Sequence, residues 1–183
     1  MLSGGPGYWF DGVDDVITVA DSAAYEFGTS DFTIITSAKI DDTTSAQGFY
    51  EKRTDGNARV SLYTDGDSYL NGIMKFGGAT VISAEYQTAL SAGVQYQLAW
   101  VCDRDTSNYL YLNGDSKTLG INTKDDAAND SQTGATTIGL GGDAVAEFGG
   151  SMSYLRQFNL ALTAAEVKAF SNGAAIPYKY IGA

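Results

Sequence analysis

Three aspartates near the start of the chain have the spacing most suggestive of chemistry. Asp11 precedes a glycine, and Asp14 and Asp15 follow it closely in the stretch YWFDGVDDVITV. Calcium takes several oxygen ligands, so these carboxylates and nearby backbone carbonyls form a candidate cation site. The alternative is that Asp11 and Asp14 hydrogen-bond to the amides of a turn while Asp15 is solvated. The spacing matches no dedicated calcium loop, and both interpretations stay open.

Tyrosines form the second set of candidate ligand-binding residues. Sugars bind proteins by stacking on exposed aromatic rings beside polar side chains. Four tyrosines on or beside predicted strands are candidates for this role: Tyr63, Tyr69, Tyr109 and Tyr111. The alternative role is packing in the core or across strands, to which tyrosine is well suited. The tryptophans, Trp9 and Trp100, are predicted to be core residues.

The residues that several classes of enzyme need are missing or scattered. The chain contains no histidine, which excludes imidazole catalysis, a nucleophilic triad with histidine and most zinc sites. The glutamates do not form the closely spaced pairs of glycoside hydrolases. Cys102 lies on the apolar face of a predicted strand and is expected to be an inert core thiol. We therefore predict no catalytic residues and no enzymatic activity.

The charge of the chain restricts its partners. Acidic residues outnumber basic ones by 22 to 11, for a formal net charge of −11. Nucleic acids and anionic membranes require a basic patch, so neither is expected as a partner. No stretch is apolar and long enough for insertion into a membrane. The start of the chain lacks the pattern of a signal peptide, so we expect the protein to stay where it is made or to leave by another route.

Short strands separated by turns account for most of the chain. Asp31–Ile40 and Gly93–Cys102 alternate apolar and polar residues as strands do. Tyr8–Val19 is predicted to form a β-hairpin, and Asn113-Gly114 is typical of a two-residue hairpin turn. The polar stretch Ile121–Ala135 is interpreted as a long surface loop.

One helix is predicted, at Thr163–Asn172, because Thr163 and Glu166 have the spacing of a capping box. The expected fold class is all-β: a two-sheet antiparallel jelly roll or β-sandwich, with this short C-terminal helix covering an end or an edge. The domain is expected to span residues 8–173, between an N-terminal arm (1–7) and a C-terminal tail (174–183). The predicted core includes Phe32, Ile34, Leu98, Trp100, Leu155 and Phe158.

Five segments occur in the order found in a LamG-like jelly roll. They are FDGVDD, FGTSDFTI, YLYLNG, IGLGG and FGGSMSYLRQFNLALTAAEV. Over roughly Tyr8–Asn172 the chain thus resembles this family, which belongs to the concanavalin A-like lectin/glucanase superfamily. The resemblance implies the jelly-roll fold and a module for adhesion, sugar binding or structural support. Ser153 and Tyr154 stand where the family often has an acidic pair that supports a cation site, so calcium is a candidate rather than an implied cofactor.

Two functions are compatible with this resemblance. The first is a surface component of a phage virion (tail, fibre or head decoration), made in the host cytoplasm and bound to other virion proteins, to copies of itself or to host surface glycans. The tail IPYKYIGA resembles segments that follow such domains in bacteriophage structural proteins. The alternative is a soluble, carbohydrate-binding, lectin-like module of a larger extracellular adhesin or glycan-degrading protein. At least one end of the chain is expected to pack on a partner, and folding back of both ends is the alternative.

Overall fold

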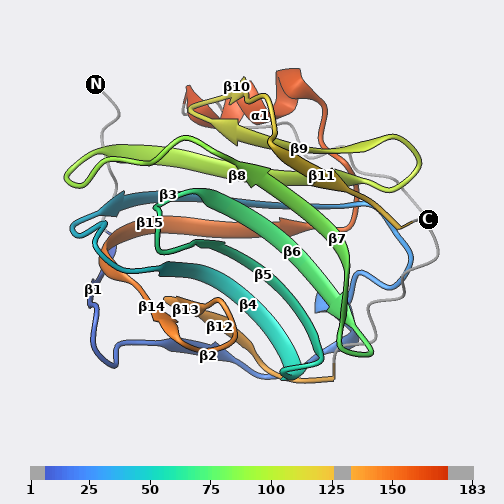
Figure 1. Ribbon diagram of the computed structural model, residues 1–183, viewed down its shortest axis with the longest axis horizontal. Helices are drawn as coiled ribbons and strands as arrows, with labels where there is room; N and C mark the ends of the chain where they lie inside the picture. The colour runs from blue at the N-terminus through green and yellow to red at the C-terminus, as the bar shows by residue number, and fades with distance from the viewer. Residues whose placement is uncertain (1–6, 126–132, 173–183) are drawn as a thin grey trace.

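The computed structural model describes residues 7–125 and 133–172, which form two antiparallel sheets packed face to face (Figure 1). Sheet A consists, in spatial order, of β1 (Tyr8–Asp11), β15 (Gly149–Phe158), β3 (Phe32–Ile40), β8 (Gln95–Asp103), β9 (Ser107–Leu112) and β10 (Asp115–Ser116). Sheet B consists of β11 (Ile121–Thr123), β7 (Ala79–Tyr86), β6 (Leu70–Phe76), β5 (Ala58–Thr64), β4 (Gln47–Asp55), β12 (Thr136–Ile138) and β2 (Ile17–Val19). A separate small hairpin is formed by β13 (Leu140–Gly141) and β14 (Ala146–Glu147). The predicted all-β jelly roll is confirmed.

The main core lies between the two sheets. β3 and β8 pair so that Ile34 lies opposite Trp100, and both side chains are fully buried. Gly72 on β6 faces the indole of Trp100, and a Cβ at this position would overlap the ring. Glycine is therefore what allows sheet B to pack against Trp100. Of the predicted core residues, Phe32, Ile34, Leu98 and Trp100 are buried, and Leu155 and Phe158 are half-buried.

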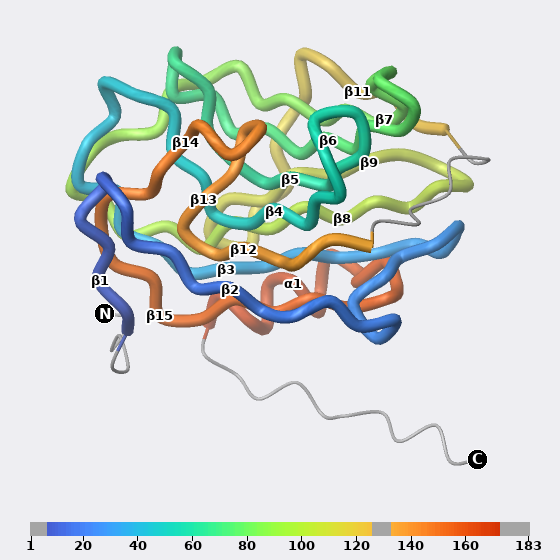
Figure 2. The backbone as a smooth tube through the Cα atoms, turned by 90° about the horizontal axis from the view of Figure 1, so that it is seen from below, coloured from blue at the N-terminus to red at the C-terminus, as the bar shows by residue number. Residues whose placement is uncertain are grey.

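Helix α1 (Ala164–Ser171) begins with the predicted capping box. Thr163 Oγ1 accepts the N–H of Glu166, while the Glu166 carboxylate accepts the N–H of Thr163 at 2.8 Å. The predicted place of the helix is wrong, because α1 covers the outer face of sheet A (Figure 2). This face is apolar and needs cover, and Phe170 of α1 packs in one cluster with Ile35 and Val101. Within the described residues, neither α1 nor the short 3₁₀ helix η1 (Ala23–Tyr25) has the length and apolar character to cross a membrane.

Tyr8–Val19 does not form the predicted hairpin. β1 pairs with β15 in sheet A, whereas β2 pairs with β12 in sheet B, so the turn between β1 and β2 crosses from one sheet to the other. Each of these short strands gains a long-range neighbour, and the sandwich gains an edge strand on each sheet. Trp9 is not a core residue: Phe10 takes the buried position on β1, and Trp9 is 64% exposed.

Two further expectations concern the polar segments and the chain ends. The stretch predicted as a loop after residue 120 begins with β11, which pairs with β7 and extends sheet B. The expectation that an end of the chain packs on a partner concerns the arm (1–7) and the tail (174–183), and all of these residues except Gly7 lie outside the described residues.

Candidate ligand-binding site

The outer face of sheet B, which is the face turned away from sheet A, is lined by polar side chains. Alternate residues of β5 enter the core, which places Arg59, Ser61 and Tyr63 on the outer face. The strand register extends this surface to β6, where Lys75 lies opposite Arg59 and Asn71 lies opposite Tyr63. This surface is called the sheet B face below.

The β13–β14 hairpin lies on the sheet B face against β4 (Figure 1). Gly48 of β4 permits this close approach, because a Cβ there would overlap the backbone of Gly141. In the turn of the hairpin, the N–H of Gly142 donates to Ser61 Oγ at 3.1 Å. Asp143 follows with φ = 84°, a left-handed conformation that is uncommon for residues with a side chain. The turn is thereby held on the middle of the face.

Asp143 links the hairpin to a cluster of charges on the sheet B face. Its Oδ1 lies 2.6 Å from Arg59 Nη1 and 3.5 Å from Arg53 Nη1. Its backbone N–H donates to Glu51 Oε2 at 2.9 Å. The contact with Arg59, followed by the charges of Arg53 and Lys75, holds the pKa of the Asp143 carboxyl below its usual value. Arg59 is only 5% exposed, and charged side chains are rarely buried to this extent without partners. The cluster is therefore preformed and largely buried, and Asp143 and Arg53 are its more exposed side chains, at 42% and 32%.

The structure divides the four candidate tyrosines between the two sheets. Tyr63 lies on the sheet B face, and Tyr69 directly precedes β6 of the same sheet; both are half-buried. Tyr109 and Tyr111 lie on β9 of sheet A, with ring centroids 6.5 Å apart. Tyr111 is packed with α1 and only 4% exposed, and this burial raises the pKa of its hydroxyl. The four rings therefore do not form one stacking surface, and Tyr63 is the one beside the polar cluster.

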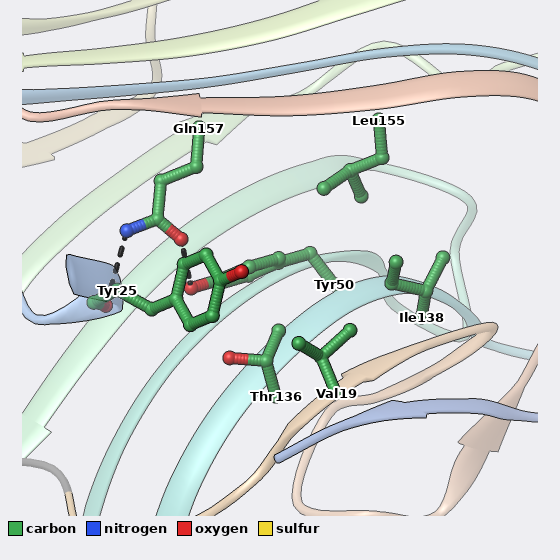
Figure 3. Close-up of a pocket in the computed structure, with 7 residues that line it drawn as sticks. All are labelled: Val19, Tyr25, Tyr50, Thr136, Ile138, Leu155 and Gln157. Atoms are coloured by element: carbon green, nitrogen blue, oxygen red, sulfur yellow. Dashed lines mark hydrogen bonds between the residues drawn. The ribbon is translucent and has the colours of Figure 1, made fainter. Parts of the chain in front are cut away.

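A pocket opens between the sheets, where β2 and β12 of sheet B face β15 of sheet A (Figure 3). The volume of this cavity is about 170 Å³. It is lined by seven side chains, none of which carries a charge: Val19, Tyr25, Tyr50, Thr136, Ile138, Leu155 and Gln157. The pocket is therefore suited to an uncharged group with an apolar surface.

Hydrogen bonds fix the polar wall of this pocket, as the dashed lines in Figure 3 show. The Oε1 atom of Gln157 accepts from the Tyr50 hydroxyl at 2.9 Å, and its Nε2 donates to the backbone oxygen of Tyr25 at 3.0 Å. The two bonds together require one orientation of the Gln157 amide. Thr136 is 6% exposed, and its Oγ1 has no hydrogen-bond partner among the described residues.

A buried ion pair holds the chain segment beside the pocket. Lys52 Nζ lies 2.6 Å from Asp21 Oδ1 and donates to the backbone oxygen of Gly134 at 3.0 Å. The Lys52 side chain is fully buried, and Lys52 lies opposite Thr136 in the pairing of β4 with β12. Lys52 thus ties the segment between β2 and η1 to the wall of the pocket.

The three candidate metal ligands come together in the turn between β1 and β2. One carboxylate oxygen from each of Asp11, Asp14 and Asp15 lies within 4.8 Å of the others. Asp11 Oδ1 accepts from the N–H of Val13 at 2.8 Å and from that of Asp14 at 3.3 Å, and these bonds lower the pKa of Asp11. Asp15 Oδ2 accepts from the N–H of Asp11 at 2.9 Å. The hydrogen-bonded turn of the alternative interpretation is thus present. The carboxylates that accept its backbone N–H groups are those of Asp11 and Asp15, whereas Asp11 and Asp14 were expected.

Sequence reasoning did not single out the charges on the sheet B face or the polar wall of the pocket. A signal existed for Arg53 and Arg59, because a turn at residues 55–57 places them opposite each other on β4 and β5. No local pattern connects Arg59 with Asp143, and none connects Tyr50 with Gln157. These contacts depend on pairings between distant parts of the chain.

Several solved structures share this fold. The native heptameric SAP-like pentraxin from Limulus polyphemus has a TM-score of 0.64 and 16% sequence identity, over 89% of this chain and 80% of the pentraxin chain. The CBM40 of Ruminococcus gnavus IT-sialidase, bound to α2,3 sialyllactose, has a TM-score of 0.64 and 15% identity, over 86% and 97% of the two chains. Domain 4 of a GH43 extracellular arabinanase from Geobacillus stearothermophilus, in complex with arabinotriose, has a TM-score of 0.65 and 18% identity, over 92% and 82%. At these identities the similarity concerns the fold.

The sequence itself matches one family profile over most of the two sheets. No curated protein matches the chain. The profile of the Laminin_G_3 family, described as the concanavalin A-like lectin/glucanases superfamily, matches residues 11–168. This range extends from the end of β1 into α1 and so includes both candidate surfaces. The chain therefore belongs to the concanavalin A-like lectin/glucanases superfamily.

Proposed function

We propose that this chain is a non-catalytic carbohydrate-binding module that binds a glycan on the sheet B face. The observation that carries the proposal is the preformed charge cluster around Asp143, whose more exposed side chains, Asp143 and Arg53, lie on the same face as the half-buried ring of Tyr63. A glycan presents hydroxyl groups and apolar C–H faces. It is therefore matched by hydrogen-bonding side chains placed next to an aromatic ring.

The solved structures with this fold support a carbohydrate ligand. The CBM40 was solved with sialyllactose and the arabinanase domain with arabinotriose. The arabinanase is described as extracellular, which supports an extracellular place of action for this chain as well. The proposed lack of catalysis is supported by the absence of histidine from the sequence and by the scattered glutamates.

A glycan array tests this function. The purified chain is expected to bind a defined group of related glycans, and soluble glycan of the same type is expected to compete for binding. A reducing-end assay on the same glycans is expected to show no turnover. Binding to no glycan would refute the proposed function, and turnover would refute its non-catalytic part.

A second candidate function is assembly into a phage virion, as a tail, fibre or head-surface component. The exposed Tyr8 and Trp9 on β1 favour it, because β1 is an edge strand of sheet A. An edge strand with apolar side chains can pair with a strand of a partner or of a second copy. Sedimentation velocity tests self-assembly of the chain. Association that increases with protein concentration and weakens in Trp9→Ser would support this role. A protein that stays monomeric at every concentration would contradict it.

A further inference from the structure

We propose that the pocket in Figure 3 is a second ligand site, which binds one uncharged sugar ring. The class of ligand rests on the proposed carbohydrate-binding function, but the residues differ from those of the sheet B face. β4 separates the two sites: Glu51 and Arg53 point to the sheet B face, whereas Tyr50 lines the pocket. The two sites can therefore be changed independently.

The size of the pocket selects a small ligand. Its volume is about 170 Å³, whereas a cavity needs roughly 10–15 Å³ on the same measure to hold one water molecule. This space holds a single ring rather than an oligosaccharide. Val19, Ile138 and Leu155 give it an aliphatic lining, and the ring of Tyr25 is partly exposed at the pocket. Such a surface matches the C–H face of a sugar ring.

The polar groups of the pocket select a ligand with hydroxyl groups. Thr136 Oγ1 is buried without a hydrogen-bond partner in the described part of the chain. A buried hydroxyl in this state is unfavourable, and native structures usually supply it with a partner. Thr136 lines the pocket, and a rotation of its side chain about χ1 would present this buried hydroxyl to a ligand hydroxyl, which would complete its hydrogen bonding.

The absence of charge in the lining selects a neutral ring. No lining residue is ionised, and the nearby Lys52 ammonium is already paired with Asp21. A carboxylate that entered the pocket would lose water without gaining a cationic partner. We therefore expect hexoses and pentoses to bind, and sugar acids to be excluded from this site.

The walls of the pocket are held in place without a ligand. Gln157 connects Tyr50 on sheet B to the backbone of Tyr25 in η1, and Asn159 Nδ2 donates to the backbone oxygen of Glu26 at 3.3 Å. Together with the Lys52–Asp21 pair, these contacts fix the segment that carries the Tyr25 ring. Preorganisation of this kind lowers the cost of binding a small ligand.

Saturation-transfer NMR on the intact chain tests the second site. The probes are D-glucose, D-galactose, D-mannose and L-arabinose, with N-acetylneuraminic acid as the charged comparison. Thr136→Val removes only the hydroxyl, and Tyr25→Ala removes a partly exposed ring. The matched control is Tyr109→Ala on sheet A, Tyr63→Ala reports binding on the sheet B face, and the thermal unfolding of each variant shows whether it folds.

We expect at least one neutral sugar to bind the wild type. Its affinity is expected to fall about fivefold to tenfold in Thr136→Val, as for the loss of one hydrogen bond, and similarly in Tyr25→Ala. Tyr109→Ala should bind it as the wild type does, and Tyr63→Ala should lose only the part of the signal that comes from the sheet B face. Thr136→Val should unfold at the same temperature as the wild type or above it, because it removes a buried hydroxyl that lacks a partner.

Three results would overturn the inference. If binding of the neutral sugars is unchanged in Thr136→Val and Tyr25→Ala but lost in Tyr63→Ala, the sheet B face is the only site, and the proposed function stands. If no monosaccharide binds while the glycan array is positive, the second site is again excluded and the function stands. If neither the monosaccharides nor the array shows binding, the second site and the proposed function fail together.

Discussion

Replacing Asp21 by asparagine should destabilise the protein more than replacing its partner Lys52 by methionine. The two side chains form an ion pair of 2.6 Å, but their surroundings differ, since the Lys52 side chain is fully buried and that of Asp21 is 36% exposed. Asp21→Asn leaves the Lys52 ammonium buried without an anionic partner. Lys52→Met removes the buried charge, and the remaining carboxylate of Asp21 can turn to water.

These surroundings set the size of the two effects. Removing one partner of a buried pair costs about 3–5 kcal/mol when the other charge stays buried, which is the case for Asp21→Asn. Lys52→Met retains most of the apolar side chain and loses mainly the hydrogen bond to the backbone of Gly134, at a cost of about 1 kcal/mol. For a chain of this size about 1 kcal/mol corresponds to 2–4 °C in Tm. Asp21→Asn should therefore lower Tm by roughly 6–20 °C and Lys52→Met by about 2–4 °C.

Thermal unfolding followed by circular dichroism, together with urea titration, measures both variants. The exposed pair of Lys39 and Asp41, at 3.2 Å, provides the control: Asp41→Asn should change stability by less than about 1 kcal/mol. If Lys52→Met lowers Tm as much as Asp21→Asn or more, the argument that burial of the ammonium sets the cost is wrong.

Other predictions concern the core, the charges and the cation candidate. Gly72→Ala should destabilise the protein by about 1–3 kcal/mol in urea titrations because its Cβ would overlap the Trp100 ring; unchanged stability would contradict the packing described for β6. Asp143 has a lowered pKa in the folded state, so the stability that it contributes is present above its unfolded pKa, near 3.8, and is lost as the pH falls through and below that value. Between about pH 5 and pH 3, Asp143→Asn should therefore lose less stability than the wild type does. The difference between the two proteins should be less than about 1 kcal/mol, because the side chain is partly exposed. An equal loss in both proteins would show that Arg59 does not stabilise the carboxylate. Any calcium bound by the described residues should lie at Asp11, Asp14 and Asp15. Asp14→Asn should therefore lower the affinity for calcium at least about tenfold in isothermal titration calorimetry. Calcium binding that is unaffected by this change would place the ion elsewhere.

Local patterns in the sequence predict those parts of the fold that depend on neighbouring residues. The capping box at Thr163 and Glu166 is such a case, because both partners lie within one helical turn. The Asn113-Gly114 turn is another: the φ angles of 54° and 81° are the left-handed values that asparagine and glycine tolerate best. The place of α1 was predicted wrongly, although a signal existed: adjacent Ile34 and Ile35 point to opposite faces of β3, and both faces must be covered.

The candidate sites depend on pairings that no local pattern contains. β1 and β2 are too short to determine their own partners, and each joins a different sheet. Tyr63 and Tyr109 both alternate as strand residues do, but the register of distant strands decides which sheet displays each ring. The contact between Arg59 and Asp143 forms only after the β13–β14 hairpin has folded onto β4 and β5.

The most direct test of glycan binding on the sheet B face compares two tyrosine variants. The glycan bound best on the array is titrated into the wild type, Tyr63→Ala and Tyr109→Ala by isothermal titration calorimetry, with Lys75→Ala as a second change on the same face. Loss of one stacking ring is expected to weaken binding about tenfold or more in Tyr63→Ala, and Lys75→Ala should weaken it less. Tyr109→Ala, on the other sheet, should bind as the wild type does. Binding that is unchanged in Tyr63→Ala and Lys75→Ala but lost in Tyr109→Ala would contradict the assignment of the site to sheet B.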